Sequence, residues 1–138
     1  MKRKVFALIA VCAFLLTGCN LQGDGKWALP SDAPTYQLID NEDNGEVTVS
    51  YNGRTYVPYG TVSGRITESD IKECIGSIRN DGRRLYLLND DKDGNFIMVC
   101  NIGGIMDQPE FWRASDTRRE KIYHPDFITP SDDDTRTW

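Results

Sequence analysis

The chain has 138 residues, with 16 Lys and Arg against 21 Asp and Glu, and 39% of its residues are hydrophobic. Residues 1–18 include three of the basic residues, so residues 19–138 carry 13 basic against 21 acidic side chains, a net charge of −8. A chain of this length forms one domain with a modest core. Its negative charge argues against a general nucleic-acid-binding protein and against electrostatic docking on anionic lipid.

The first 20 residues have the pattern of a targeting signal. Three basic residues at positions 2–4 precede an apolar run over residues 5–16. As a helix this run would measure about 18 Å, which is shorter than the roughly 30 Å core of a bilayer. A signal peptide is therefore favoured over a membrane span.

The run ends in Leu16, Thr17, Gly18 and Cys19, which resembles the lipobox of bacterial lipoproteins. The resemblance implies a diacylglyceryl group on the Cys19 sulfur and cleavage between Gly18 and Cys19. It also implies an anchored protein on the cell membrane or the outer membrane, facing outside the cytoplasm. The alternatives are a plain secretory signal that happens to contain a cysteine, or a buried N-terminal helix.

The composition divides the chain into four parts. Residues 1–18 are the signal peptide, and residues 19–34, rich in turn formers, are a lipidated tether. Residues 35–128 form a single domain, and residues 129–138 form an acidic tail, with frayed chain expected from Pro125 onward. Trp27 in the tether is expected either to pack on the domain or to lie at the membrane interface.

Residues 46–59 predict a β-hairpin. Alternating apolar residues precede Asn52 and Gly53, the pair that favours a type I′ turn, and a two-residue loop places Val49 opposite Tyr56. Pro58 lacks an amide donor, so we expect the second strand to lie at an edge or to end there. The sequence from Asn52 to Pro58 is similar to the NG-x-x-Y-V-P hairpin of copper amine oxidase N-terminal-like domains, but Tyr59 follows where that family usually has Leu.

A helix is predicted next. Ile71, Cys74, Ile75 and Ile78 have the i, i+3, i+4, i+7 spacing of one helical face, and Thr67 with its acidic partner three residues later approximates a capping box. Residues 84–88 and 96–100 predict a central hairpin with both faces covered. Residues 108–114 predict one helical turn. The expected fold class is α+β, with mainly antiparallel hairpins packed on one short helix.

Asn89, Asp91 and Asp93, followed by Gly94, match the first half of a calcium-binding loop. The twelfth loop position is Cys100, where such a loop requires a glutamate, and the flanking residues predict strands. The alternative is therefore a polar hairpin turn that holds no metal.

Cys74 and Cys100 are the two cysteines that remain when Cys12 and the lipidated Cys19 are set aside. Outside the cytoplasm such a pair commonly forms a disulfide, which here would join the predicted helix to the central hairpin. The alternative is two buried thiols.

Tyr51, Tyr56, Tyr59, Trp112 and Arg113 are candidate partner-binding residues, since Tyr, Trp and Arg dominate binding hot spots. The alternative for these residues is core packing.

The sequence thus predicts a lipid-anchored, non-enzymatic binding module for a protein or glycan partner, with no cofactor. An inhibitor or immunity protein is one concrete form, because an acidic surface complements a basic toxin or enzyme. The alternative is a small cell-envelope hydrolase that uses His124, the only histidine, or a pair of acidic residues. A His124 buried beside an acidic group in an open pocket would favour the hydrolase.

Overall fold

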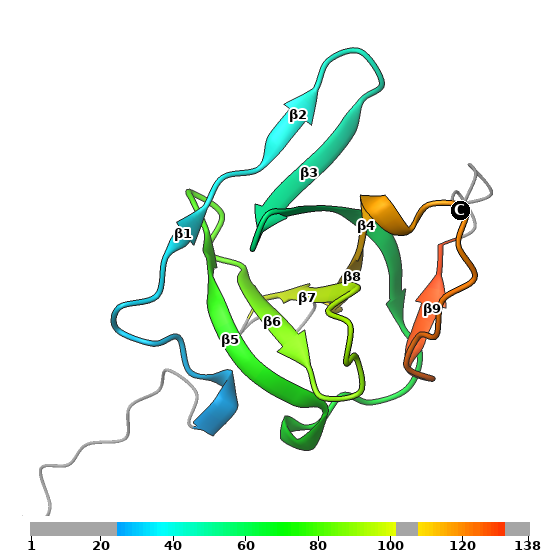
Figure 1. Cartoon of the computed structure of the whole chain (residues 1–138). Coiled ribbons are helices and arrows are strands. Elements are labelled where there is room, and N and C mark those ends of the chain that lie inside the picture. The colour runs from blue at the N-terminus through cyan, green and yellow to red at the C-terminus, as the bar shows by residue number, and fades with distance from the viewer. Residues whose placement is uncertain (1–24, 102–107, 132–138) are drawn as a thin grey trace, which may run out of the picture.

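The structure, a computed structural model, describes residues 25–101 and 108–131, and within these ranges it has nine strands, three short 3-10 turns and no α-helix. The predicted α+β class is therefore wrong, and the fold is β (Figure 1). The strands are β1 (Thr35–Tyr36), β2 (Ile39–Asn41), β3 (Glu46–Tyr51), β4 (Arg54–Val62), β5 (Ile71–Ile78), β6 (Arg84–Leu88), β7 (Phe96–Cys100), β8 (Glu110–Ala114) and β9 (Ile128–Pro130). The turns are η2 (Gly25–Trp27), η3 (Glu68–Asp70) and η4 (Ser115–Thr117).

The strands form one curled sheet in the order β1-β5-β6-β7-β8-β4-β3-β2, and β9 pairs with β4. All pairs are antiparallel except β1 with β5. In a flat sheet β1 and β3 would lie about 29 Å apart, at about 4.8 Å for each neighbouring pair. Instead the rings of Tyr36 on β1 and Tyr51 on β3 meet with centroids 6.1 Å apart. The sheet therefore curls until its two ends come into contact, as Figure 1 shows.

Residues 71–78 form strand β5 instead of the predicted helix. Two register shifts in the pairing of β5 with β6 each insert an extra residue, and an extra residue moves the following side chains to the other face. Ile71 and Cys74 therefore pack in one core cluster, and Ile75 and Ile78 pack in the other. The two bulges thus explain how residues with the apolar spacing of a helix can all be buried in a β-strand.

The predicted capping box lies at η3 and does not start an α-helix. The Thr67 amide donates to the Asp70 carboxylate at 2.7 Å, but the turn ends at Asp70 and the chain continues directly into β5. A β-branched residue, Ile71, is the first residue of that strand, in keeping with the preference of such residues for strands.

Two further predictions at the C-terminal end are wrong. Residues 110–114, predicted as part of a helical turn, form strand β8 between β7 and β4. The chain after Pro125 is not frayed where the structure describes it, because Pro125 is fully buried and Ile128–Pro130 pairs with β4. Residues 132–138 of the predicted tail lie outside the described residues.

The first predicted hairpin is confirmed. Val49 is opposite Tyr56 and Tyr51 is opposite Arg54, around a turn in which Asn52 and Gly53 have φ of 49° and 77°. Pro58 lies where β4 has left β3 and has not yet met β9, so its missing amide donor costs no pairing on that side.

The second predicted hairpin, β6 with β7, is also confirmed and is central. Alternate residues of β7 enter two buried clusters on opposite faces of the sheet. One cluster contains Phe96, Met98 and Cys100, and the other contains Ile97 and Val99. Both faces of these strands are therefore covered, as their continuous apolar runs indicate.

The second half of the predicted tether is part of the fold. The Trp27 ring packs edge-on against Tyr86, with centroids 5.6 Å apart, and its carbonyl accepts from the Tyr86 hydroxyl at 2.8 Å and from Arg84 at 2.9 Å. Further along, the Pro34 carbonyl accepts from the Ser77 amide of β5, and the Tyr36 carbonyl accepts from the Arg79 amide. The stem from Cys19 to Gly25, the first described residue, is six residue steps long and can reach at most about 20 Å.

Candidate functional site

The predicted aromatic binding residues belong mostly to the core. Tyr56 and Trp112 are each 2% exposed in one cluster, and Tyr59 is 7% exposed in the other. Tyr51 is half-buried against the Tyr36 ring. These residues hold the curled sheet together, and they are not the exposed binding surface that their types suggested.

Arg113, the last of the predicted binding residues, is also buried. Its guanidinium donates to the Thr117 hydroxyl at 2.8 Å and to the Thr117 and Glu120 carbonyls, and it lies 5.2 Å from the centre of the Tyr59 ring. These contacts fix the turn η4 to the sheet. A buried charge with this many donors satisfied has a structural role here.

Arg54, which sequence reasoning left aside, makes the densest set of contacts. Its guanidinium donates to both Asp116 carboxylate oxygens at 2.7 and 2.9 Å, to the Asp93 and Gly94 carbonyls and to the Asn95 amide oxygen. The Arg54 guanidinium holds the pKa of the Asp116 carboxyl below its usual value. Arg54 therefore ties the β3–β4 turn, the loop before β7 and η4 together.

Two of the three side chains of the calcium candidate, Asp91 and Asn89, form hydrogen bonds with the backbone. The Asp91 carboxylate accepts from the Asn95 and Phe96 amides at 3.0 and 2.8 Å, and burial raises its pKa in spite of these bonds. The side-chain amide of Asn89 donates to the Ser69 and Ile71 carbonyls. Within residues 25–101 and 108–131 no three His, Cys, Asp or Glu side chains are grouped as metal ligands would be.

The predicted disulfide is not formed, and Cys74 and Cys100 are both buried free thiols. The two cysteines lie on β5 and β7 with the whole of β6 between them, so their Cα atoms are about 10 Å apart or more, beyond the roughly 7 Å that a disulfide bridges. Burial, with a smaller contribution from Cys74, raises the pKa of the Cys100 thiol to about 11. Such a thiol is a poor nucleophile at neutral pH.

The structure places His124 in the segment that precedes β9. It is partly exposed, and its Nδ1 lies 3.1 Å from the Pro125 carbonyl oxygen. The neighbouring Tyr123 is 64% exposed and donates to Asp90 at 2.6 Å. A cavity of about 550 Å³ lies elsewhere, and its described lining is Thr61, Arg83, Val99, Cys100, Asn101, Gln108 and Glu110.

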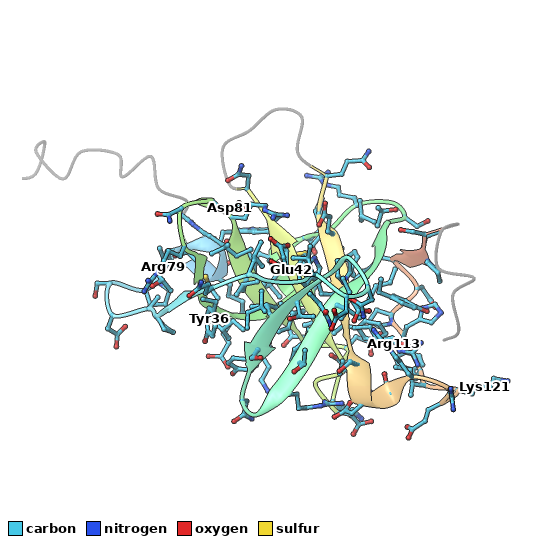
Figure 2. The ribbon with its side chains drawn as sticks, turned by 90° about the horizontal axis from the view of Figure 1, so that it is seen from above. Tyr36, Glu42, Arg79, Asp81, Arg113 and Lys121 are labelled. Atoms are coloured by element: carbon cyan, nitrogen blue, oxygen red, sulfur yellow. The ribbon has the colours of Figure 1, made fainter. Side chains whose placement is uncertain are left out.

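The β2–β3 hairpin is the feature that the core and these networks leave exposed. It projects from the curled sheet (Figure 1), and all residues from 39 to 45 are exposed. Figure 2 looks down on it and shows Glu42 near the middle of the view, between Tyr36 and Arg79 on one side and Arg113 and Lys121 on the other. We take this hairpin as the candidate functional site.

Hydrogen bonds and a salt bridge hold the tip of the hairpin. The Asn41 carbonyl accepts from the Gly45 amide at 2.7 Å, and its side-chain oxygen accepts from the Asp43 amide at 3.0 Å. The Asn44 side chain accepts from the Glu46 amide at 2.9 Å, and the carboxylate of Glu46, the first residue of β3, forms a salt bridge with Arg118. Asn and Asp side chains that bond nearby amides are typical of such turns.

Charge and apolar surface meet on β2. Ile39 is 55% exposed, and Asp40, Glu42 and Asp43 follow it. Among the described residues, no Lys or Arg forms a salt bridge with these three carboxylates. Sequence reasoning missed this site, although Asn44 and Gly45 between two short runs were a usable turn signal.

Among the described residues no helix is long and apolar enough to cross a bilayer. The lipidation candidate Cys19 lies outside the described residues. Comparison of the chain with protein-family models, with curated proteins and with solved structures found no match.

Proposed function

We propose that this protein is a lipid-anchored binding module that stands outside the cytoplasm and presents its β2–β3 hairpin to a protein partner. The observation that carries the proposal is the projecting hairpin, exposed from residue 39 to residue 45, on a sheet that has a buried cluster on each face. The hairpin carries carboxylates that form no salt bridge with a described Lys or Arg and that do not belong to the core, so we assign it to recognition.

The short stem supports an orientation for this module. The fold begins at η2, six residues after Cys19, so an anchor at Cys19 holds η2 within about 20 Å of the lipid. Figure 1 shows η2 and the tip of the β2–β3 hairpin at opposite ends of the molecule. The hairpin then points away from the membrane, where the negative lipid surface does not repel its carboxylates.

The partner we favour is a protein with a basic surface, which includes the inhibitor or immunity role. Edge-strand backbone groups and carboxylates are suited to peptide groups and to Lys or Arg side chains. No observation favours a hydrolase, because the one condition set for it, His124 buried beside an acidic group in an open pocket, is not met in the described structure.

The test is photo-crosslinking in intact cells. A photoreactive amino acid replaces Glu42 at the hairpin tip in one variant and Asp126, an exposed residue near β9, in the control. We expect Glu42 variants to crosslink one or a few proteins that the Asp126 variants do not. Equal crosslinking from both positions, or none from position 42, would contradict the proposal.

A further inference from the structure

β2 is an edge strand with one neighbour. It lies at the end of the strand order and pairs with β3 alone among the described strands. Alternate backbone N–H and C=O groups of an edge strand point away from the sheet, where they form a template for another strand. The hairpin therefore offers an open pairing edge as well as charge.

The side chains of β2 alternate in chemistry as well as direction. Ile39 is opposite Thr48 on one face, and Asp40 is opposite Val47 on the other face. Ile39 gives an added strand an apolar neighbour, and Asp40 gives it a negative charge. A strand that alternates a β-branched residue with Lys or Arg would complement both faces.

Natural edge strands avoid self-association by carrying charge, and the charged side chains of β2 and of the turn that follows it are all negative. Asp40, Glu42 and Asp43 repel a second copy of the same edge, because like charges placed side by side are unfavourable. They attract a basic strand instead. Charge complementarity thus favours a basic strand over a second copy of this chain as the occupant of the edge.

From this edge and its charge, we propose that β2 takes an extended, Lys- or Arg-containing segment of a partner protein as an additional strand of the sheet. The proposal rests on the proposed function and names the partner's chemistry at the same hairpin. The pairing of β2 with β3 and the hydrogen bonds of the turn lower the entropic cost of binding, because β2 is already in an extended conformation.

The experiment uses the full chain in mild detergent and two labelled eight-residue peptides, one alternating Val with Lys and the other alternating Val with Glu. Fluorescence anisotropy measures their binding, and hydrogen exchange followed by mass spectrometry locates it. We expect the Lys peptide to bind at least tenfold more tightly than the Glu peptide and to protect the segment that contains Ile39 and Asn41.

Two variants with the same change of charge separate edge pairing from general attraction. Asp40→Lys should weaken binding of the Lys peptide about tenfold, which corresponds to about 1.4 kcal/mol. Asp126→Lys, on an exposed residue away from β2, should leave binding within twofold. Ile39→Thr keeps a β-branched residue and tests the apolar contact without disturbing the strand.

The proposal is overturned if the Lys peptide does not bind, if Asp126→Lys weakens it as much as Asp40→Lys, or if the protected segment excludes β2. Protection of β2 that grows with protein concentration and without peptide would identify a second copy as the occupant, and this too would overturn the proposal. If these peptide experiments fail but crosslinking from position 42 succeeds, strand addition is excluded as the mode of binding and the proposed function is still supported.

Discussion

Replacing Trp27 by Ala tests whether the N-terminal segment is a fixed part of the sheet. The ring is partly buried against the cluster that contains Tyr86, with the two rings edge-on at an interplanar angle of 70°. The Trp27 carbonyl, which accepts from Arg84 and Tyr86, is retained in the variant. The loss is therefore confined to the ring and its packing.

The expected cost follows from that burial. Truncating a fully buried Trp to Ala costs about 3–5 kcal/mol, and the edge-on pair contributes about 0.5–1.5 kcal/mol of such a loss. Because the Trp27 ring is only partly buried, we expect a loss of about 2 kcal/mol in the free energy of unfolding. With a urea dependence of about 2 kcal/mol per molar, the midpoint should fall by about 1 M.

Urea unfolding followed by circular dichroism measures this difference, and Leu29→Ala is the matched control. Leu29 is two residues further along the same segment and is 38% exposed, so its truncation should change stability by less than about 0.5 kcal/mol. Equal effects of the two variants, or a loss below 0.5 kcal/mol for Trp27→Ala, would show that the segment is not fixed in this way. The stem would then be longer than six residues.

Three further predictions concern the sheet itself. Arg54→Ala should lower the free energy of unfolding by about 2 kcal/mol in the same urea assay, because five acceptor atoms each lose a hydrogen bond, although the Gly94 carbonyl keeps the one from the Tyr56 hydroxyl; Asp116→Asn at an exposed carboxylate should cost less than 1 kcal/mol. Gly76→Ala should lower the melting temperature by at least 5 °C, because φ is 152° and a Cβ would lie 2.3 Å from the Pro34 carbonyl oxygen; an unchanged melting temperature would mean that β1 does not pack there. The pKa of the Cys100 thiol is raised to about 11, so the fold favours the neutral thiol. The stability that this preference contributes is complete below the unfolded pKa of about 8.5 and is lost as the pH rises toward 11. Cys100→Ala should therefore show a shallower fall in melting temperature between pH 8.5 and 11 than the unmodified chain, and parallel curves would refute the assigned burial.

Local chemistry explains why some elements were predictable. The turn at Asn52 and Gly53 needs positive φ at both positions, a requirement written into two adjacent residues, and it sets the register of Val49 with Tyr56. The β6–β7 hairpin was predictable because continuous apolar runs are typical of strands buried on both faces.

Elements that depend on the whole sheet were not predictable. The two bulges in β5 arise from its pairing with β6, and they distribute Ile71 and Ile75 onto opposite faces, which a single-strand pattern does not reveal. The curl that joins Tyr36 to Tyr51 is equally a property of the seven strands from β1 to β3 together.

The candidate site shows the same division. Trp112 and Tyr56 have the side chains of a binding surface, and only the pairing of β8 with β4 places them in the core. The exposed edge at Ile39 could not be predicted from the sequence either. Its strand is three residues long, too short for an alternating pattern to stand out, and its exposure depends on where the sheet ends.

The proposed function depends most on the lipid anchor, and the intact mass of the mature protein tests this anchor most directly. The protein is purified from the membranes of its own host, and its mass is compared with that of the chain beginning at Cys19. We predict a mass that exceeds this chain by a diacylglyceryl group, with or without a further acyl chain, and loss of the modification in Cys19→Ala. An unmodified mature chain, or one that starts at a residue other than Cys19, would contradict the account.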